Sequence, residues 1–112
     1  MNTKKAGAII RIIFYILRHD GREKEDFDSS DILLRYKDLL KEPYHGDNIK
    51  EIIRKFKKRR DKMEIKTLQK ESSLRGWLNK HVDIKEIFWF ERLNGRFRIK
   101  SELLKTLGAR NE

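Results

Sequence analysis

Residues 86–100 read Glu-Ile-Phe-Trp-Phe-Glu-Arg-Leu-Asn-Gly-Arg-Phe-Arg-Ile-Lys, and this stretch carries the clearest information about the fold. Asn94-Gly95 lies between two runs of residues that favour strands, which is the strongest short-range signal for a β-hairpin. A two-residue turn at this position places Phe90 opposite Ile99. The sequence therefore predicts an antiparallel hairpin close to the C-terminal end of the chain.

The predicted register gives the hairpin two chemically different faces. One face is apolar and is expected to pack on the rest of the protein, whereas the other is mostly charged. The apolar face holds Phe88, Phe90, Phe97 and Ile99, with Arg92 near the tip, and the charged face holds Trp89, Glu91, Leu93, Arg96, Arg98 and Lys100. Glu91 and Arg98 form an opposite-charge pair across the strands.

The sequence before the hairpin predicts helices. Residues 5–19 are almost continuously apolar, which is typical of a buried central helix. A second helix is expected from about residue 30 to residue 40, with N-cap oxygens at 28–30. We expect the third helix to start near Asn48, because Pro43 and Gly46 break the chain before it.

The region between the third helix and the hairpin has a weaker pattern. Residues 63–67 alternate between apolar and polar side chains, which allows a short strand. Residues 67–81 predict helical structure, interrupted near Ser72 and Ser73, and leucines at 103–107 predict a short closing helix. We therefore expect a mostly α fold with a C-terminal β-hairpin (α+β), in a single domain covering residues 1–112.

Composition limits the cellular setting. The chain has no cysteine, which excludes disulfides, thiolate metal sites and a cysteine nucleophile and favours a reducing compartment. The lysines at 4–5 and the apolar run after them resemble the start of a signal peptide. Arg11 interrupts that run, and residues 18–20 are charged where a cleavage site needs small residues. We expect a cytoplasmic protein that does not associate with membranes.

The net charge of +10 is unevenly distributed. Residues 1–47 carry nine basic and nine acidic side chains, whereas residues 48–112 carry 19 basic and nine acidic ones. The whole excess lies in the C-terminal part, and a field of this sign attracts polyanions. Nucleic acid is the commonest polyanionic partner, and released counterions would drive its binding.

Several helices followed by a hairpin with basic residues at its tip resemble a winged helix-turn-helix domain. The resemblance implies a recognition helix that enters the major groove of DNA and a hairpin, the wing, that contacts the backbone or the minor groove. It also implies binding to double-stranded DNA, as a small regulator or as a replication or partition factor. Many such proteins bind repeated half-sites as homodimers.

Two segments are candidates for the recognition helix. The first is residues 48–60, because residues 54–60 carry six positive charges and no negative one, whereas a solubilising helix face normally mixes both signs. The candidate contacts there are Lys50, Arg54, Lys55, Lys57, Lys58 and Arg59. The second is residues 73–81, directly before the hairpin, where Arg75, Asn79 and Lys80 would face the groove. At the hairpin tip, Arg92, Asn94, Arg96 and Arg98 are suited to phosphate contact.

No catalytic pattern stands out. The three histidines are far apart in sequence and lack metal-ligand spacing, so we expect no metal site and no cofactor. Glu64-Ile65-Lys66 matches the E-x-K element of metal-dependent nucleases, with Asp47 or Asp61 as the upstream acid, but this short motif is common in chains rich in Lys and Glu. Residues 15–19 are similar to the opening helix of RNA 2′-phosphotransferases, yet the chain has no room for that family's second lobe. We therefore expect a binding protein and not an enzyme.

Two alternatives to a DNA-binding protein stay open. One is a protein that binds RNA. The other is a protein-interaction module, an inhibitor or adaptor whose basic face docks on an acidic partner, with Tyr44, Trp77 and Trp89 as aromatic anchors.

Overall fold

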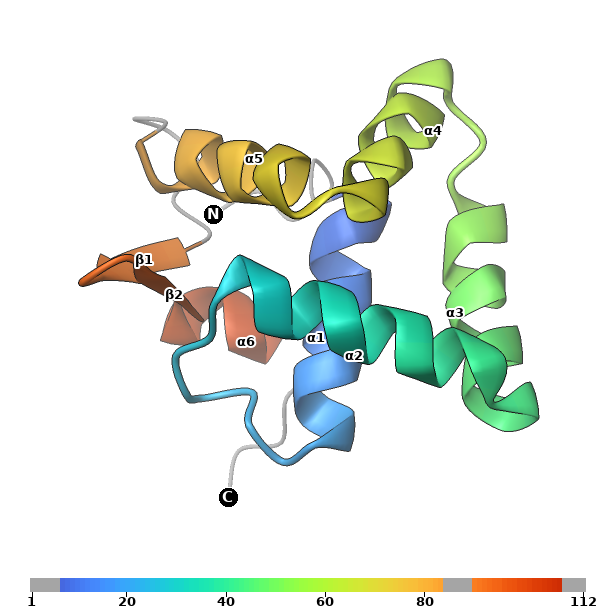
Figure 1. Ribbon diagram of the computed structural model, residues 1–112, viewed down its shortest axis with the longest axis horizontal. Helices are drawn as coiled ribbons and strands as arrows, with labels where there is room; N and C mark the ends of the chain where they lie inside the picture. Colours follow the sequence, from blue (N-terminus) through green and yellow to red (C-terminus); the bar gives the residue numbers. More distant parts are fainter. Residues whose placement is uncertain (1–6, 84–89, 108–112) are drawn as a thin grey trace.

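The computed structural model of the protein describes residues 7–83 and 90–107. Within these ranges the chain is mostly helical, with a two-stranded antiparallel hairpin near its C-terminal end (Figure 1). The α+β fold class predicted from the sequence is therefore confirmed. The elements are α1 (Ala8–His19), α2 (Ser29–Lys41), α3 (Pro43–Lys55), α4 (Arg59–Ile65), the 3₁₀ turn η2 (Lys66–Gln69), α5 (Glu71–Asp83), β1 (Phe90–Leu93), β2 (Arg96–Ile99) and α6 (Ser101–Leu107).

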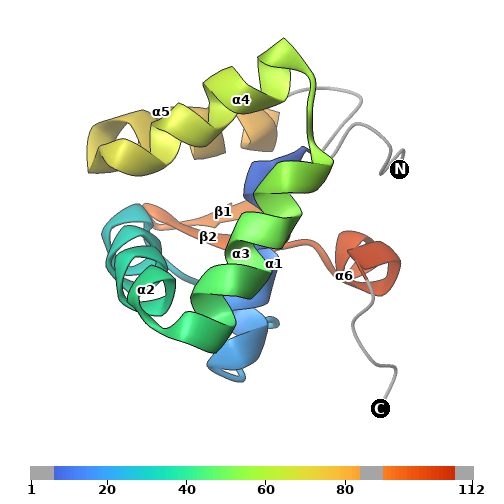
Figure 2. The same cartoon turned by 90° about the vertical axis from the view of Figure 1, so that its right-hand side faces the viewer.

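Helix α1 forms the centre of the molecule, as its apolar sequence predicts. Eight of its residues between Ala8 and Leu17 are buried. The helix contacts α2, α3 and α4, and Figures 1 and 2 show the other elements arranged around it. Among the residues described, no helix has both the length and the apolar character required to cross a membrane.

The hairpin has the register that the sequence predicts. Phe90 pairs with Ile99, Glu91 with Arg98, Arg92 with Phe97, and Leu93 with Arg96. The turn residues Asn94 and Gly95 have φ angles of 50° and 81°, and two successive positive φ values are characteristic of a type I′ turn. The apolar face is buried at Phe90, Phe97 and Ile99, while Phe88 and Trp89 lie outside the described residues.

A third extended segment lies against the hairpin. Phe27, just before α2, forms an antiparallel bridge with Phe97, and each backbone N–H donates to the other residue's carbonyl oxygen at 2.7 Å. The ring of Phe27 also packs against Phe90, with 6.0 Å between ring centroids. On the other side, α5 contacts both α2 and β1. The Phe27–Phe97 bridge thus joins the hairpin to the segment between α1 and α2.

The third helix starts earlier than predicted. Pro43 is at the first position of α3, where a missing N–H costs no hydrogen bond and the fixed φ suits a helix. Gly46 lies inside this helix, and a Cβ at Gly46 would lie 2.5 Å from the carbonyl oxygen of Leu40. Glycine is used here because α2 and α3 approach closely, and the prediction of a break before Asn48 is wrong.

Two further local predictions are corrected. Residues 63–67 form no strand: they belong to α4 and to the 3₁₀ turn after it. The side chain of Met63 is 61% exposed, so the alternation does not define a buried strand face. The predicted break within residues 67–81 is present, but it comes at Lys70, so Ser72 and Ser73 lie in the first turn of α5 and neither is its cap.

Candidate nucleic-acid interface

The site residues predicted from the sequence fall on two sides of the molecule. The hairpin and α5 lie on one side, and α3 with its connection to α4 lies on the other (Figure 1). The view turned by 90° agrees, with α3 in front and the strands behind it (Figure 2). One flat surface therefore does not contain all of these residues, and the two sides are described separately.

On the hairpin side, the arginines are engaged with acidic side chains. Arg96 donates to Asp28 Oδ2 at 3.2 Å and lies 3.3 Å from Asp26 Oδ2. Arg98 donates through Nε to Glu91 at 2.9 Å, as the predicted register requires. These contacts neutralise much of the charge that a DNA-binding wing would use. Arg92 and Asn94 are exposed at the tip.

Helix α5 offers few cations to a ligand. The guanidinium of Arg75 is exposed, but it forms an ion pair with Glu71 one turn earlier. Lys80 is exposed as predicted, whereas Asn79 is only partly exposed and its Oδ1 is buried. The second candidate recognition helix therefore presents a nearly neutral surface.

The middle of α3 also has mixed charge. Lys50 and Arg54 line a shallow hollow that they share with Asp47, Asn48 and Glu51. Glu51 forms an ion pair with Arg54. This face has the alternating signs of an ordinary solvated helix.

The connection from α3 to α4 is different in sign and in exposure. Lys55, Lys57, Lys58 and Arg59 are all exposed. Within the described parts of the chain, none of these four side chains has an ion-pair partner. Like charges placed side by side repel one another, and this repulsion raises the free energy of the unbound protein. An anionic ligand would reduce the repulsion.

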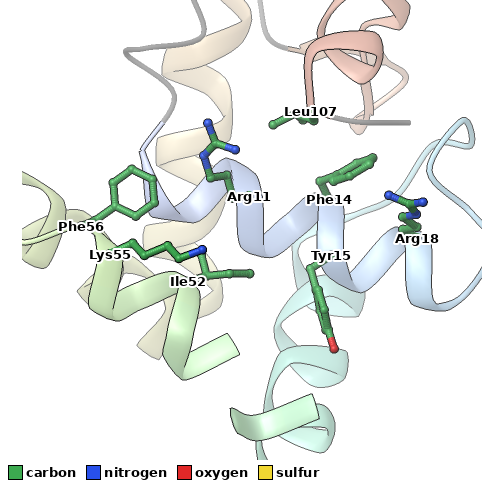
Figure 3. A pocket seen from close by; sticks show the side chains of 8 residues that line it. All are labelled: Arg11, Phe14, Tyr15, Arg18, Ile52, Lys55, Phe56 and Leu107. Carbon is green, nitrogen blue, oxygen red and sulfur yellow. The ribbon is translucent and has the colours of Figure 1, made fainter. Parts of the chain in front are cut away.

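A pocket adjoins this segment at the contact between α1 and α3. It has a volume of about 460 Å³, and Figure 3 shows the side chains that line it, which come from α1, from α3 and the residue after it, and from α6. The lining residues are Arg11, Phe14, Tyr15, Arg18, Ile52, Lys55, Phe56 and Leu107. Lys55 belongs both to the pocket and to the exposed basic segment, so the two form a continuous surface.

Aromatic rings hold two of the pocket's cations in place. The Arg11 guanidinium carbon lies 5.9 Å from the centroid of the Phe56 ring, and that of Arg18 lies 5.8 Å from the centroid of the Phe14 ring. Both separations lie within the range of a cation–π interaction. The pocket therefore combines an apolar floor with positive charge at its edges.

Sequence reasoning missed this pocket, although a signal was present. Arg11, Tyr15 and Arg18 are spaced at i, i+4 and i+7 in an otherwise apolar helix, which places them on one face. We refer to Arg11, Arg18, Lys55, Lys57, Lys58 and Arg59 together as the basic surface.

The structure also brings together two histidines that are distant in sequence. His19 is the last residue of α1 and His45 lies in the first turn of α3, and their ring centroids are 4.4 Å apart. Glu42, at the N-cap of α3, completes a cluster of three groups with ligand atoms within 4.8 Å of one another. Next to it, two hydrogen bonds from Arg35 hold the pKa of the Asp20 carboxyl below its usual range.

The aromatic residues suggested as anchors of a protein-interaction module differ in how exposed they are. Tyr44 is 73% exposed, but Trp77 is only 6% exposed and packs against Phe90 in the core. Trp89 lies outside the described residues. Trp77 is therefore a core residue in this fold, which removes one of the three aromatic anchors suggested for a protein partner.

The E-x-K residues lie in helical structure. Glu64 is in α4, and Lys66 begins the 3₁₀ turn. The upstream acid Asp61 is buried, and a Cβ at Gly7 would lie 3.0 Å from its Oδ1 and 3.1 Å from Glu64 Oε2. The two carboxylates thus face the N-terminus of α1, where negative charge stabilises the helix.

Comparisons of the chain with protein-family models, with curated proteins and with solved structures gave no match. The chemistry of the surfaces described above is therefore the basis for assigning a function.

Proposed function

We propose that the protein binds double-stranded DNA through the basic surface formed by α1, the end of α3 and the start of α4. The observation that carries the proposal is the exposed row of Lys55, Lys57, Lys58 and Arg59, which has no acidic partner within the described residues. A cluster of exposed cations without acidic partners attracts a polyanion rather than a neutral ligand. Neutralising phosphates there would release condensed counterions and drive binding.

The pocket gives this surface a second kind of contact. Phosphates would lie along the α3–α4 connection, and the cations at the pocket edge would hold a phosphate or sugar next to the apolar floor. Contacts to phosphate and sugar fix the orientation of a protein on the duplex but carry no direct sequence information. We therefore expect binding that depends strongly on salt and weakly on sequence.

The choice of a duplex as the ligand rests on the resemblance to winged-helix domains and not on the position of the basic surface. Phe27 pairs with β2, and α5 packs on α2 and runs toward β1, which is similar to the order of elements in winged-helix domains. The exposed tip residues Arg92 and Asn94 are then a separate, weaker contact point. The basic surface lies on the opposite side and is proposed to supply most of the affinity.

The test compares two double charge reversals in fluorescence-anisotropy titrations with a DNA duplex. Lys57→Glu/Lys58→Glu changes the basic surface, and Lys37→Glu/Lys41→Glu makes the same change in net charge on exposed positions of α2. The first variant is expected to weaken binding more than about tenfold and to reduce the slope of log K against log salt by roughly two. The second is expected to bind much like the wild type.

Three outcomes would contradict the proposal. Equal weakening by both variants would show that only net charge matters. Normal binding by Lys57→Glu/Lys58→Glu, together with loss in Arg92→Ala, would move the interface to the hairpin. Tighter binding to duplex or single-stranded RNA than to duplex DNA, measured in the same titration, would make RNA the ligand.

A further inference from the structure

The cluster of His19, Glu42 and His45 has the donor atoms of a transition-metal site. Two imidazoles and one carboxylate are ligands that Zn²⁺ accepts, with the fourth position of its tetrahedron open to water. Glu42 is the N-cap of α3 and His45 lies in its first turn, so the two side chains can meet at the start of the helix. His45 Nε2 is 3.7 Å from Glu42 Oε2.

The distances require only a small closure. Bonds of about 2.0–2.2 Å to a tetrahedral ion place the ligand atoms roughly 3.3–3.6 Å from one another. The ligand atoms here already lie within 4.8 Å of one another. The side chain of Glu42 is 56% exposed and that of His19 is 32% exposed, so rotation about their χ angles can bring the groups together without moving the helices.

Each histidine is held through its other nitrogen, as metal-binding histidines usually are. His19 Nδ1 lies 2.9 Å from Asp20 Oδ1, and because the carboxylate only accepts, Nδ1 donates and the lone pair remains on Nε2. Asp20 is itself fixed by Arg35, whose Nε and Nη2 donate to it at 2.9 and 2.7 Å. This chain of contacts sets both the orientation and the tautomer of the ring.

The second ring is held in the same way by a different partner. His45 Nδ1 lies 2.7 Å from the hydroxyl oxygen of Tyr15, and Asn48 Nδ2 donates to that oxygen at 3.0 Å. When Nε2 of His45 binds a metal ion on the side of Glu42, Nδ1 carries the proton and donates to the Tyr15 oxygen.

We propose that His19, Glu42 and His45 bind one Zn²⁺ ion. The ion would link the C-terminal end of α1 to the junction of α2 and α3. It would leave one coordination position facing solvent. Because Tyr15 lines the α1–α3 pocket and also contacts His45, the ion would fix the two helices that form the pocket.

The proposal is tested on the full-length protein, free of any affinity tag, by calorimetric titration with ZnCl₂ and by thermal unfolding with and without the metal. We expect one Zn²⁺ per chain and a melting temperature that rises with Zn²⁺ concentration. Loss of a residue that hydrogen-bonds to a metal ligand typically reduces metal affinity by about 10–100-fold. Glu42→Gln and His19→Gln each remove a ligand itself and should reduce Zn²⁺ affinity by more than this. Asp20→Asn should fall within that range.

Matched controls separate this site from adventitious binding. Glu51→Gln removes a partly exposed carboxylate of α3, and His81→Gln removes the histidine that lies outside the cluster. Both should bind Zn²⁺ like the wild type. Circular dichroism of the metal-free variants shows whether each one is folded. If His19→Gln is unfolded, Glu42→Gln still tests the proposal, because Glu42 is at an exposed position.

The proposal is overturned if the wild type binds no Zn²⁺, or if Glu42→Gln and His19→Gln bind it as tightly as the controls do. Loss of binding in His19→Gln but not in Glu42→Gln would also overturn the three-ligand site, since it would leave Glu42 without a role.

Discussion

Gly46 and Gly76 are both inside helices, but their surroundings predict opposite effects of substitution by alanine on stability. A Cβ at Gly46 would lie 2.5 Å from the Leu40 carbonyl oxygen, whereas a Cβ at Gly76 would have no atom within 4 Å. Alanine favours a helix over glycine by about 0.5–1 kcal/mol. At Gly46, the clash with the backbone is expected to outweigh this gain.

We therefore predict that Gly46→Ala lowers the free energy of unfolding by about 1–3 kcal/mol, the usual cost of overpacking. Gly76→Ala should raise it by about 0.5–1 kcal/mol. Urea unfolding followed by circular dichroism measures both. Equal effects of the two substitutions would show that α2 and α3 separate easily and that the close approach at Leu40 is not maintained in solution.

At the scale of the element, α2 depends on a charged cap. The carboxylate of Asp28 accepts from the backbone N–H of Asp31 at 2.7 Å. This bond, followed by that from Ser30, keeps the pKa of Asp28 below its ordinary value of 3.8. The folded state thus binds the proton less tightly than the unfolded chain. The cap's contribution is present above the ordinary pKa and is lost as the pH falls through the lower, folded value.

Asp28→Ala is predicted to lower the free energy of unfolding by about 0.5–2 kcal/mol at neutral pH. Asp28→Asn keeps a capping oxygen without a titrating group and should cost less. The stability difference between wild type and Asp28→Asn, measured by urea unfolding from neutral pH down to pH 3, should shrink toward the acid end. A difference that stays constant with pH would mean that the carboxylate does not act as the cap.

The elements also show which information is local in the sequence. The hairpin register was predictable because a turn signal and an alternating pattern lie within a few residues of one another. The start of α3 was not, because Pro43 and Gly46 have the composition of a break. Pro43 fits the first position of the helix for local reasons, whereas the need for glycine at position 46 comes from its close approach to Leu40 at the end of α2.

The same division applies to the candidate sites. The run of cations from Lys55 to Arg59 is visible in the sequence, and Lys55, Lys57, Lys58 and Arg59 are exposed in the fold. The ion pair of Arg96 with Asp28 was not predictable, because its partners are 68 positions apart. The pairing of His19 with His45 likewise requires α1 and α3 to meet.

For the whole molecule, the net charge of +10 predicts that salt stabilises the fold. Screening reduces repulsion between exposed like charges, and the Debye length falls from about 10 Å at 0.1 M salt to about 3 Å at 1 M. We expect the melting temperature to rise as NaCl increases from about 0.05 to about 0.5 M. A relief of about 1 kcal/mol corresponds to roughly 4 °C for a domain of this size.

Lys57→Glu/Lys58→Glu should show a smaller rise, because it removes much of the repulsion on the basic surface. Differential scanning fluorimetry over a NaCl series measures both proteins. A wild-type melting temperature that falls with added salt would show that ion pairs such as Arg35–Asp20 outweigh the repulsion.

The bridge between Phe27 and Phe97 has a consequence for how the chain reaches this fold. A two-stranded hairpin is at best marginally stable in water without further packing, so β1 and β2 depend on a segment from the opposite end of the chain. The entropy cost of closing a long loop grows only slowly with the length of the loop. The two segments of this contact are nevertheless far apart in the sequence, so the ribosome synthesises them at different times. Folding of the C-terminal part is therefore expected to wait for the α1–α2 region and to be slower than the helical content alone would suggest.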